Sequence, residues 1–418
     1  MKVCVLALLA TSFLHSADQR QLALALKAQA DFERVAAALR PRIPDAAVCM
    51  QSQAAALAVG PPEELALLDY RKGYCAFAAA AATLDPRQFL AAATEFDKAI
   101  EAWPAHIRKG AKHAAPEPVP AALRVFAGIA RLHAATEVAA MDAARQEIAA
   151  ALPSPPCNSN LMPATFCADL LSAGAQWLGW IALRENQLDA ASSHFSSNLT
   201  SGWSAWVQGR HDFDAGRFDA AARQYASAID RWKQIWQDEG PTLLQSLGPR
   251  PQRAVALADW AGARMLAGDL DGAILTLDAS LQADSTSPHA LFLRARAKEL
   301  AGRKDEALAD YNLASRNAFA AAKDLASGEA HLYRGIVLYR RLDFARAEEE
   351  FSSALNFEMT GALRPDARAW RHLAAVAGGS CGEARQSLNL ALSTVSPFFP
   401  QAEARSLVAA CATSAQGE

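Results

Sequence analysis

The sequence lacks any large excess of one charge. Its 41 Lys and Arg residues are balanced by 44 Asp and Glu residues, the formal net charge is -3, and no block of five or more like charges occurs. Nucleic-acid-binding proteins and polybasic membrane-binding segments concentrate positive charge on one face or in one run. The sequence therefore gives no support to nucleic acid as a partner, and we predict none.

Long apolar runs are also missing after the N-terminus, which disfavours a transmembrane protein. The N-terminus reads MKVCVLALLATSFLHSADQR, with one positive charge, an apolar run from Val3 to Ala10 and small polar residues after it. This order is typical of a secretory signal. We predict a cleaved signal over residues 1–17 and an exported protein, periplasmic or secreted. A buried first helix is the alternative.

Cysteine is scarce, and none of the seven Cys residues forms a CxxC pair or has a His at zinc-ligand spacing. A metal site is therefore poorly supported, and we predict none. Loss of Cys4 with the signal leaves six cysteines in three local pairs, an even number that suits an oxidising compartment. Six cysteines allow about fifteen pairings. Pairing of nearest neighbours, our hypothesis, gives structural disulfides between Cys49 and Cys75, Cys157 and Cys167, and Cys381 and Cys411.

Catalytic motifs are absent apart from one string. The sequence contains no GxxxxGK[ST], GxGxxG or HExxH, but residues 378–382, GGSCG, match GxSxG. That pattern marks a nucleophile only between a strand and a helix, whereas the sequence around Ser380 indicates helix, turn and helix. We therefore predict that the protein is not an enzyme and has no catalytic residues and no cofactor.

What the sequence does contain is alanine and a repeat. Abundant Ala, few β-branched residues and an apolar content of 52% indicate helices. The stretch AGDLDGAILTLDAS at 267–280 is followed thirty-four residues later by AGRKDEALADYNLA, so small residues recur at equivalent positions. A fixed period of this length indicates an array of helical hairpins. Copies of the unit occur at about 172–201, 202–235, 254–287, 288–321, 328–361 and 366–396.

The spacing of the small and aromatic residues resembles the tetratricopeptide repeat (TPR). The resemblance implies an all-α fold, a right-handed α-solenoid of helical hairpins with a concave groove. We expect a divergent helical-hairpin region at 18–165, the TPR array at 166–400, and a C-terminal capping helix and tail at 401–418. The insert DEGPTLLQSLGPRP at 238–251 is expected to form a loop that projects from one edge.

In TPR arrays the first helix of each hairpin lines the groove. Carried over to this sequence, the resemblance implies an aromatic and cationic groove, which suits an extended or helical peptide with acidic character. Packing of the same side chains in the core is the alternative. Arg294 and Arg334 hold the seventh position of their repeats, where the guanidinium is expected to reach a neighbouring acid. The predicted groove residues are Trp180, Trp203, Trp206, Arg210, Phe213, Phe292, Arg296, Tyr339 and Arg340.

These patterns predict a non-enzymatic scaffold or adaptor that binds a protein or peptide partner in the groove. A structural protein that self-assembles or organises an envelope complex is the first alternative. A helical toroid that acts on carbohydrates is the second. Its acidic residues would have to come from runs such as Glu348–Glu350, which lies in a second repeat helix and is typical of a solvated face.

Overall fold

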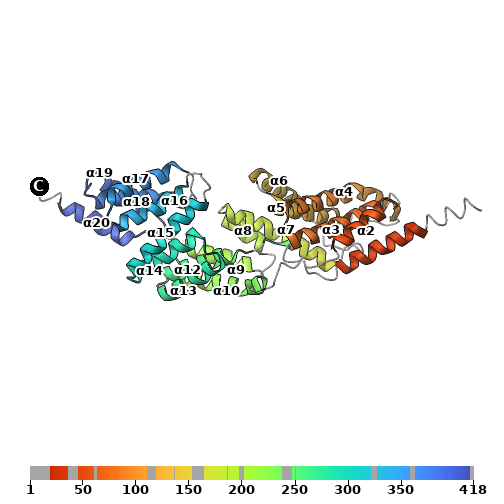
Figure 1. Cartoon of the computed structure of the whole chain (residues 1–418), viewed down its shortest axis with the longest axis horizontal. Helices are drawn as coiled ribbons and strands as arrows, with labels where there is room; N and C mark the ends of the chain where they lie inside the picture. Colours follow the sequence, from red (N-terminus) through yellow and green to blue (C-terminus); the bar gives the residue numbers. More distant parts are fainter. Residues whose placement is uncertain are drawn as a thin grey trace, which may run out of the picture. The chain divides into compact units, whose positions relative to one another are not determined.

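A computed structural model describes the chain over residues 19–35, 46–60, 64–110, 119–135, 137–152, 164–185, 187–196, 202–237, 247–249, 251–321, 327–357 and 363–414. In these ranges every regular element is a helix (Figure 1), and the predicted all-α fold class is confirmed. None of the helices in this part of the chain combines the length and apolar character that a membrane span needs. The predicted signal at 1–17 lies outside the described residues.

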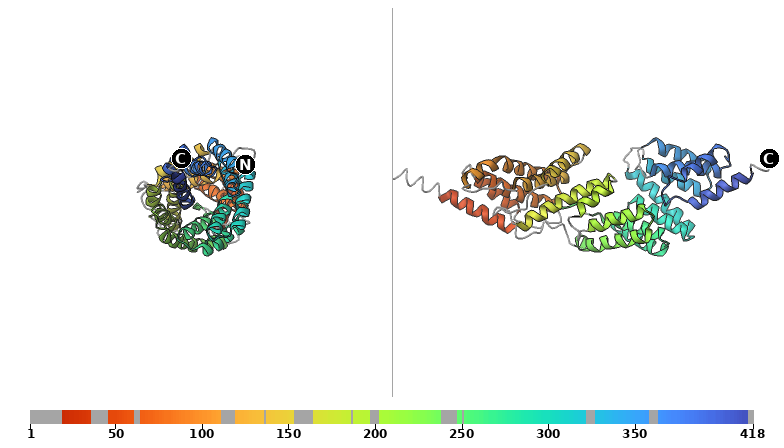
Figure 2. Two further views of the ribbon diagram at one scale, coloured as in Figure 1. Left: turned by 90° about the vertical axis from the view of Figure 1, so that its left-hand side faces the viewer. Right: turned by 180° about the vertical axis from the view of Figure 1, so that it is seen from behind.

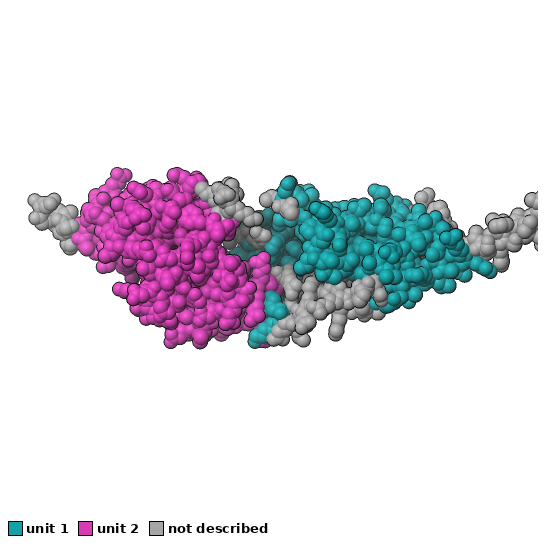
Figure 3. Space-filling model, in the orientation of Figure 1, with its two compact units in different colours: residues 1–207, 231–250 teal, residues 208–230, 251–418 magenta. Residues whose placement is uncertain are grey.

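The chain forms two compact units (Figure 3). Unit 1 consists of residues 1–207 and 231–250, and unit 2 of residues 208–230 and 251–418, so the division expected near residue 165 lies inside unit 1. Helices α9 (Gly202–Asp214) and α10 (Phe218–Gln237) contribute residues to both units.

Unit 1 opens with the helical residues 19–35. Its other helices are α2 (Ala46–Leu57), α3 (Leu65–Thr83), α4 (Pro86–Gly110), α5 (Val119–Ala134), α6 (Val138–Ala151), α7 (Ala164–Arg184) and α8 (Leu188–Phe195). Unit 2 contains α12 (Arg253–Leu266), α13 (Leu270–Ala283), α14 (Pro288–Leu300), α15 (Lys304–Ala321), α16 (Gly328–Arg340), α17 (Phe344–Asn356), α18 (Leu363–Ala377), α19 (Glu383–Ala391) and α20 (Gln401–Ser414).

Within each unit, helices pack in chain order as antiparallel pairs (Figure 2), and contacts to the first helix of the next pair join α4 to α5 and α6 to α7 in unit 1, and α13 to α14, α15 to α16 and α17 to α18 in unit 2. The glycines predicted for the turns have the left-handed backbone that such turns require, with φ of 92° at Gly268 and 80° at Gly302. Asp269 then caps α13 by accepting a hydrogen bond from the backbone N–H of Gly272. The 34-residue period therefore corresponds to one hairpin and its connection to the next.

The small residue in each first helix admits a large side chain from the second helix. A Cβ atom at Gly335 would lie 2.5 Å from the ring of Phe351, and one at Gly209 would lie 2.7 Å from the ring of Tyr225. In both hairpins the two residues are sixteen positions apart. Unit 1 repeats the contact between Gly73 and Phe96, where the Cβ distance would be 2.7 Å. Their longer spacing, twenty-three positions, explains why the repeat is hard to see in that region.

Unit 1 has a core rich in aromatic rings. Phe126 of α5 lies between Phe77 and Phe96, with ring centroids 4.7 and 4.2 Å away. His133 stacks on Phe89 at 4.6 Å and meets Trp177 of α7 edge-on at 5.2 Å. Large rings that bridge four helices bury much apolar area per residue. They stabilise hairpins whose helices differ in length.

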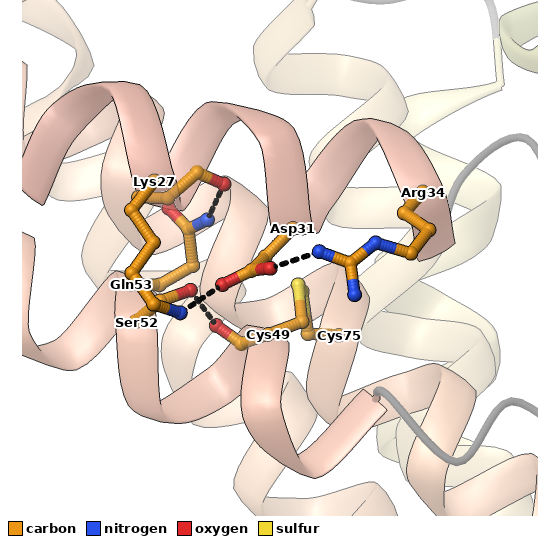
Figure 4. The surroundings of a disulfide bond; sticks show 8 residues. Lys27, Asp31, Arg34, Cys49, Ser52, Gln53 and Cys75 are labelled. Atoms are coloured by element: carbon orange, nitrogen blue, oxygen red, sulfur yellow. Dashed lines mark hydrogen bonds and ion pairs between the residues drawn. A yellow bond between two sulfur atoms is a disulfide. The ribbon is translucent and has the colours of Figure 1, made fainter.

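The helix at residues 19–35 is attached to α2 by a buried carboxylate (Figure 4). Asp31 pairs with Lys27 and with Arg34, each at 2.6 Å, and Gln53 of α2 donates a hydrogen bond to the carbonyl of Ala28. Burial opposes ionisation of Asp31, but hydrogen bonds from Lys27 and Ser52 and the two nearby cations lower its pKa below the ordinary value. Beside this contact, a disulfide joins α2 to α3 through Cys49 and Cys75.

The expectation that the insert at 238–251 projects is wrong for its last part. Leu247 is 1% exposed, and its carbonyl accepts a hydrogen bond of 2.7 Å from the indole of Trp177. The carbonyl of Pro249 accepts one of 3.2 Å from the indole of Trp203. A buried indole N–H requires an acceptor, and these carbonyls provide it. Residues 238–246 lie outside the described part of the chain.

Candidate functional site

Three predicted groove residues belong to unit 1, where the structure places them in packed surroundings. Trp203 and Trp206 are each 7% exposed and contact the ring of Trp232, at 4.9 and 5.5 Å. Trp180 is half-buried and meets Trp177 edge-on at 5.5 Å. A Cβ at Gly202 would collide with Trp232, so the glycine allows this close packing. For Trp203 and Trp206 the structure therefore corresponds to the alternative, packing in the core.

The other six predicted groove residues belong to unit 2 and lie on α9, α14 and α16, the first helices of their hairpins. They face one segment of the chain, residues 394–403, which we call the strap. Arg296, Tyr339 and Arg340 hydrogen-bond to it, and Phe213 meets one of its rings. Arg210 and Phe292 line a cavity beside it. The predicted set thus converges in unit 2, but on a segment of the protein itself.

The strap begins at a buried carboxylate of α18. Asp366 is 4% exposed and accepts hydrogen bonds from the backbone N–H of Ser396 at 2.7 Å and from its hydroxyl at 2.5 Å. Burial raises the pKa of Asp366, and the two hydrogen bonds from Ser396 oppose that rise. A buried carboxylate needs hydrogen-bond donors. In the described part of the chain, the two donors to Asp366 are the N–H and the hydroxyl of Ser396, which both belong to the strap.

Two phenylalanines form the middle of the strap. The carbonyl of Phe398 accepts a hydrogen bond of 3.1 Å from the guanidinium of Arg296, and its ring lies 5.8 Å from that of Phe213. Gly262 of α12 makes room for this ring, because a Cβ there would lie 3.1 Å from its tip. Phe399 is 3% exposed and meets Trp370 of α18 edge-on at 5.3 Å. The middle of the strap thus contacts α9, α12, α14 and α18.

A carboxylate ends the strap. Glu403, in the first turn of α20, accepts hydrogen bonds from the Tyr339 hydroxyl at 2.9 Å and from Arg340 at 2.8 Å. Arg340 also pairs with Glu299 at 2.5 Å, and Glu299 pairs with Arg296 at 2.5 Å. Burial alone would lower the pKa of Arg340, and the charges of Glu299 and Glu403 raise it. Alternating charges therefore connect Arg296 and Arg340 of the predicted groove to the strap.

The strap leaves space on both sides. One cavity of about 680 Å³ lies beside Tyr339, Arg340 and Glu403, and another of about 640 Å³ lies beside Phe213 and Phe398. The second also contains Asp259 of α12, whose pKa burial raises although His289 and Arg210 oppose the rise. Residues 394–398 of the strap line the second cavity, and Glu403 lines the first.

A disulfide between Cys381 and Cys411 ties the end of α20 to the turn before α19. Cys381 belongs to the GxSxG string, which joins α18 to α19 with a φ of 101° at Gly379. A nucleophile elbow requires a strand before its serine, whereas helix α18 precedes Ser380 here. Cys157 lies outside the described residues, so the pairing of Cys157 with Cys167 stays a prediction.

Several other charged residues of the array pair with one another. Arg294 reaches Asp278 at 2.7 Å and Asp310 at 2.8 Å, and Arg334 reaches Glu350 at 2.6 Å, as predicted for that repeat position. Glu350 also accepts from His331 at 2.8 Å, assuming the tautomer with the proton on Nδ1. The described residues contain no group of three or more His, Cys, Asp or Glu that could hold a metal ion.

Sequence reasoning missed the strap. The repeat period predicts which helix positions face the groove, but it does not predict what covers them. The available signal was SPFFP at 396–400, where two adjacent aromatic residues stand between prolines and outside the repeat register. Prolines keep such a segment out of a helix, and exposed neighbouring aromatics need a surface to pack against.

Comparison with known proteins gives matches in structure only. No family model matches the sequence, and no curated protein is similar to it in sequence. A thermophilic TPR protein from Thermus thermophilus matches with 19% identity and a TM-score of 0.36 over 51% of this chain and 100% of its own. A TPR protein from Parabacteroides merdae matches with 16% identity and a TM-score of 0.42 over 69% and 98%. Yeast Tom70 matches with 10% identity and a TM-score of 0.36 over 96% and 97%.

Proposed function

We propose that the protein is a non-enzymatic scaffold of the TPR type, and that it binds an extended peptide segment of a protein partner along the first-helix face of unit 2. One observation supports this most: that face holds a peptide segment already. The strap is bound through its backbone, its aromatic rings and a carboxylate, which are groups that any suitable peptide carries.

The chemistry of the face indicates the kind of peptide. Arg296 and Arg340 offer charged donors, and Phe213, Phe292 and Trp370 offer rings, so aromatic residues and acids are favoured. Aromatic and Arg side chains in partly closed pockets contribute most of the binding free energy in many interfaces. The partner we propose is therefore aromatic and acidic in the segment that enters unit 2.

We also propose that binding takes place outside the reducing cytoplasm, in the periplasm or after secretion. The disulfides Cys49–Cys75 and Cys381–Cys411 support this, because such bonds persist in oxidising compartments. Fractionation of expressing cells, followed by thiol alkylation and non-reducing peptide mapping, tests it. The proposal predicts both bonds in the envelope or secreted fraction. Free thiols at all four positions, or a protein confined to the cytoplasm, would contradict it.

A random peptide library displayed on phage tests the function itself. Gly262→Leu places a side chain where the Phe398 ring lies, because the three atoms nearest to a Cβ at that position belong to this ring and to Leu293. Leu275→Gln is the control: Leu275 lies on α13, a second helix, and is 69% exposed. Binders should be lost with Gly262→Leu and kept with Leu275→Gln. Equal retention by the two variants would show that the groove is not the binding surface.

A further inference from the structure

We propose that the natural ligand of unit 2 is a partner segment with the chemistry of the strap, which binds by displacing it. The segment has a hydroxyl residue followed by proline, two aromatic residues and proline, and then a carboxylate at the start of a helix. The inference rests on the proposed function and adds to it the identity of the ligand class and the step that opens the site.

Each part of the strap meets a matching feature on the groove side. Asp366 accepts an N–H and a hydroxyl, so it selects a donor pair such as that of Ser396. The absence of a side chain at Gly262 leaves room for one ring. Tyr339 and Arg340 together hold one carboxylate. Prolines on both sides of the aromatic pair restrict the backbone, which turns between Ser396 and Phe399 through a hydrogen bond of 3.1 Å, and this restriction reduces the entropy lost on binding.

The strap extends further than a cap requires. A capping segment needs to cover only the last hairpin, α18 and α19. The strap reaches Arg296 on α14, 102 positions before Phe398, and Tyr339 on α16, 64 positions before Glu403. It therefore lies along the array in the place that a ligand would take, and its contacts are those of a bound peptide.

The strap can leave because its contacts with the groove are non-covalent and only its two ends are fixed by covalent connections. Residues 392–395 connect it to α19, and the Cys381–Cys411 bond fixes the far end of α20. A segment tethered in this way competes with an effective concentration on the order of millimolar. A partner must exceed that competition, so loosening the strap raises the apparent affinity for a partner. The two cavities beside the strap give an incoming segment space to engage before the strap has left.

The test uses a fluorescent peptide with the sequence of residues 394–407, TVSPFFPQAEARSL. Anisotropy titrations measure its affinity for three oxidised full-length proteins: wild type, a loosened variant with Phe398→Ala and Glu403→Ala, and the loosened variant with Gly262→Leu added. A peptide with Ala at the positions of Phe398 and Glu403 is the control ligand. Circular dichroism verifies that each protein is folded. A fourth protein, Cys381→Ser with Cys411→Ser, keeps every strap side chain and removes only the tether.

The loosened variant should bind the strap peptide at least about tenfold more tightly than wild type does. The loosened variant should bind the control peptide at least about tenfold more weakly than it binds the strap peptide. Gly262→Leu should abolish the gain, and the tether variant should bind more tightly than wild type. Equal affinity of the loosened variant for both peptides would overturn the proposal. So would a wild-type dimer in light scattering that Phe398→Ala dissociates, because the groove would then hold the strap of a second copy.

The outcome separates this inference from the proposed function. If library peptides without the aromatic and proline pattern bind the loosened variant and are lost with Gly262→Leu, the groove binds peptides but the ligand class is wrong. If Gly262→Leu weakens the binding of neither the library peptides nor the strap peptide, the groove is not the binding surface and the proposed function fails as well.

Discussion

Both units hold a short, proline-containing segment of their own chain, but they hold it differently. Unit 1 binds residues 247–249 through two indole N–H groups that donate to backbone carbonyls, and Leu247 is buried. Unit 2 binds the strap through Asp366, Arg296 and Arg340, beside two cavities. The first segment is closely packed. The second combines polar contacts with two rings, of which Phe399 is buried against Trp370 and Phe398 is half-buried beside a cavity. We propose that the first segment is structural and the second replaceable.

Truncation of one side chain in each segment should separate the two roles. Leu247→Ala removes a fully buried side chain and should lower the free energy of unfolding by about 3 kcal/mol. Phe398→Ala removes a half-buried ring and should cost about 1–2 kcal/mol, because part of that ring is already in contact with solvent. Urea unfolding followed by tryptophan fluorescence measures both. A larger loss for Phe398→Ala than for Leu247→Ala would contradict the distinction.

The two disulfides allow a second comparison. They close loops with sequence separations of 26 and 30, so the loss of either should lower the free energy of unfolding by a similar amount, about 3 kcal/mol. Only Cys381→Ser with Cys411→Ser should change the affinity for the strap peptide, since only that bond fixes α20. Chemical unfolding and anisotropy on the two double variants measure the two effects. An equal gain in affinity from Cys49→Ser with Cys75→Ser would contradict the claim that the Cys381–Cys411 bond holds the strap in the groove.

The attachment of the N-terminal helix should depend on pH. The pKa of Asp31 is lowered in the folded protein, so its ionised form contributes stability above the unfolded pKa, and this contribution is lost as the pH falls through the folded value. Asp31→Asn should cost about 1 kcal/mol at neutral pH, since Lys27 and Arg34 are half-exposed. The difference should disappear well below about pH 4. The exposed neighbour Glu33, changed to Gln, is the control in thermal unfolding at a series of pH values.

The smallest effect we expect is an increase in stability from a substitution at Leu342. Leu342 has a φ of 63° in the turn between α16 and α17, and its side chain is 75% exposed. The equivalent turns at Gly268 and Gly302 use glycine, which has no penalty in that conformation. Leu342→Gly should therefore raise stability by about 1 kcal/mol. Gly302→Leu should lower it by a similar amount, and a differential scanning fluorimetry series compares the two.

The sequence predicted the fold well where small residues determine helix contacts. Gly335, Gly209 and the turn at Gly302 act as the period indicates, because close approach and a positive φ tolerate few other residues. The first 165 residues were harder, because the same contact between Gly73 and Phe96 has a different spacing. Aromatic rings there fill a core whose geometry no fixed period predicts.

The candidate site was predictable only in part. The groove register placed Arg296 and Arg340 on one helix face of the array, and there they contact the strap, because the helix face follows from the repeat. It did not distinguish Trp203 and Trp206, which hold other groove positions of their repeat but pack against Trp232. Whether a large ring at a groove position lies in the core depends on the next helices, and the repeat pattern does not contain that information.

Hydrogen exchange of the oxidised wild-type protein, with and without excess strap peptide, tests the central claim most directly. The peptide should replace residues 396–403 in the groove, so their backbone amides should exchange faster when it is present. The amides near Leu247 in unit 1 should remain as protected as before. Unchanged protection of residues 396–403 at saturating peptide would contradict the claim that the strap is a resident, replaceable ligand.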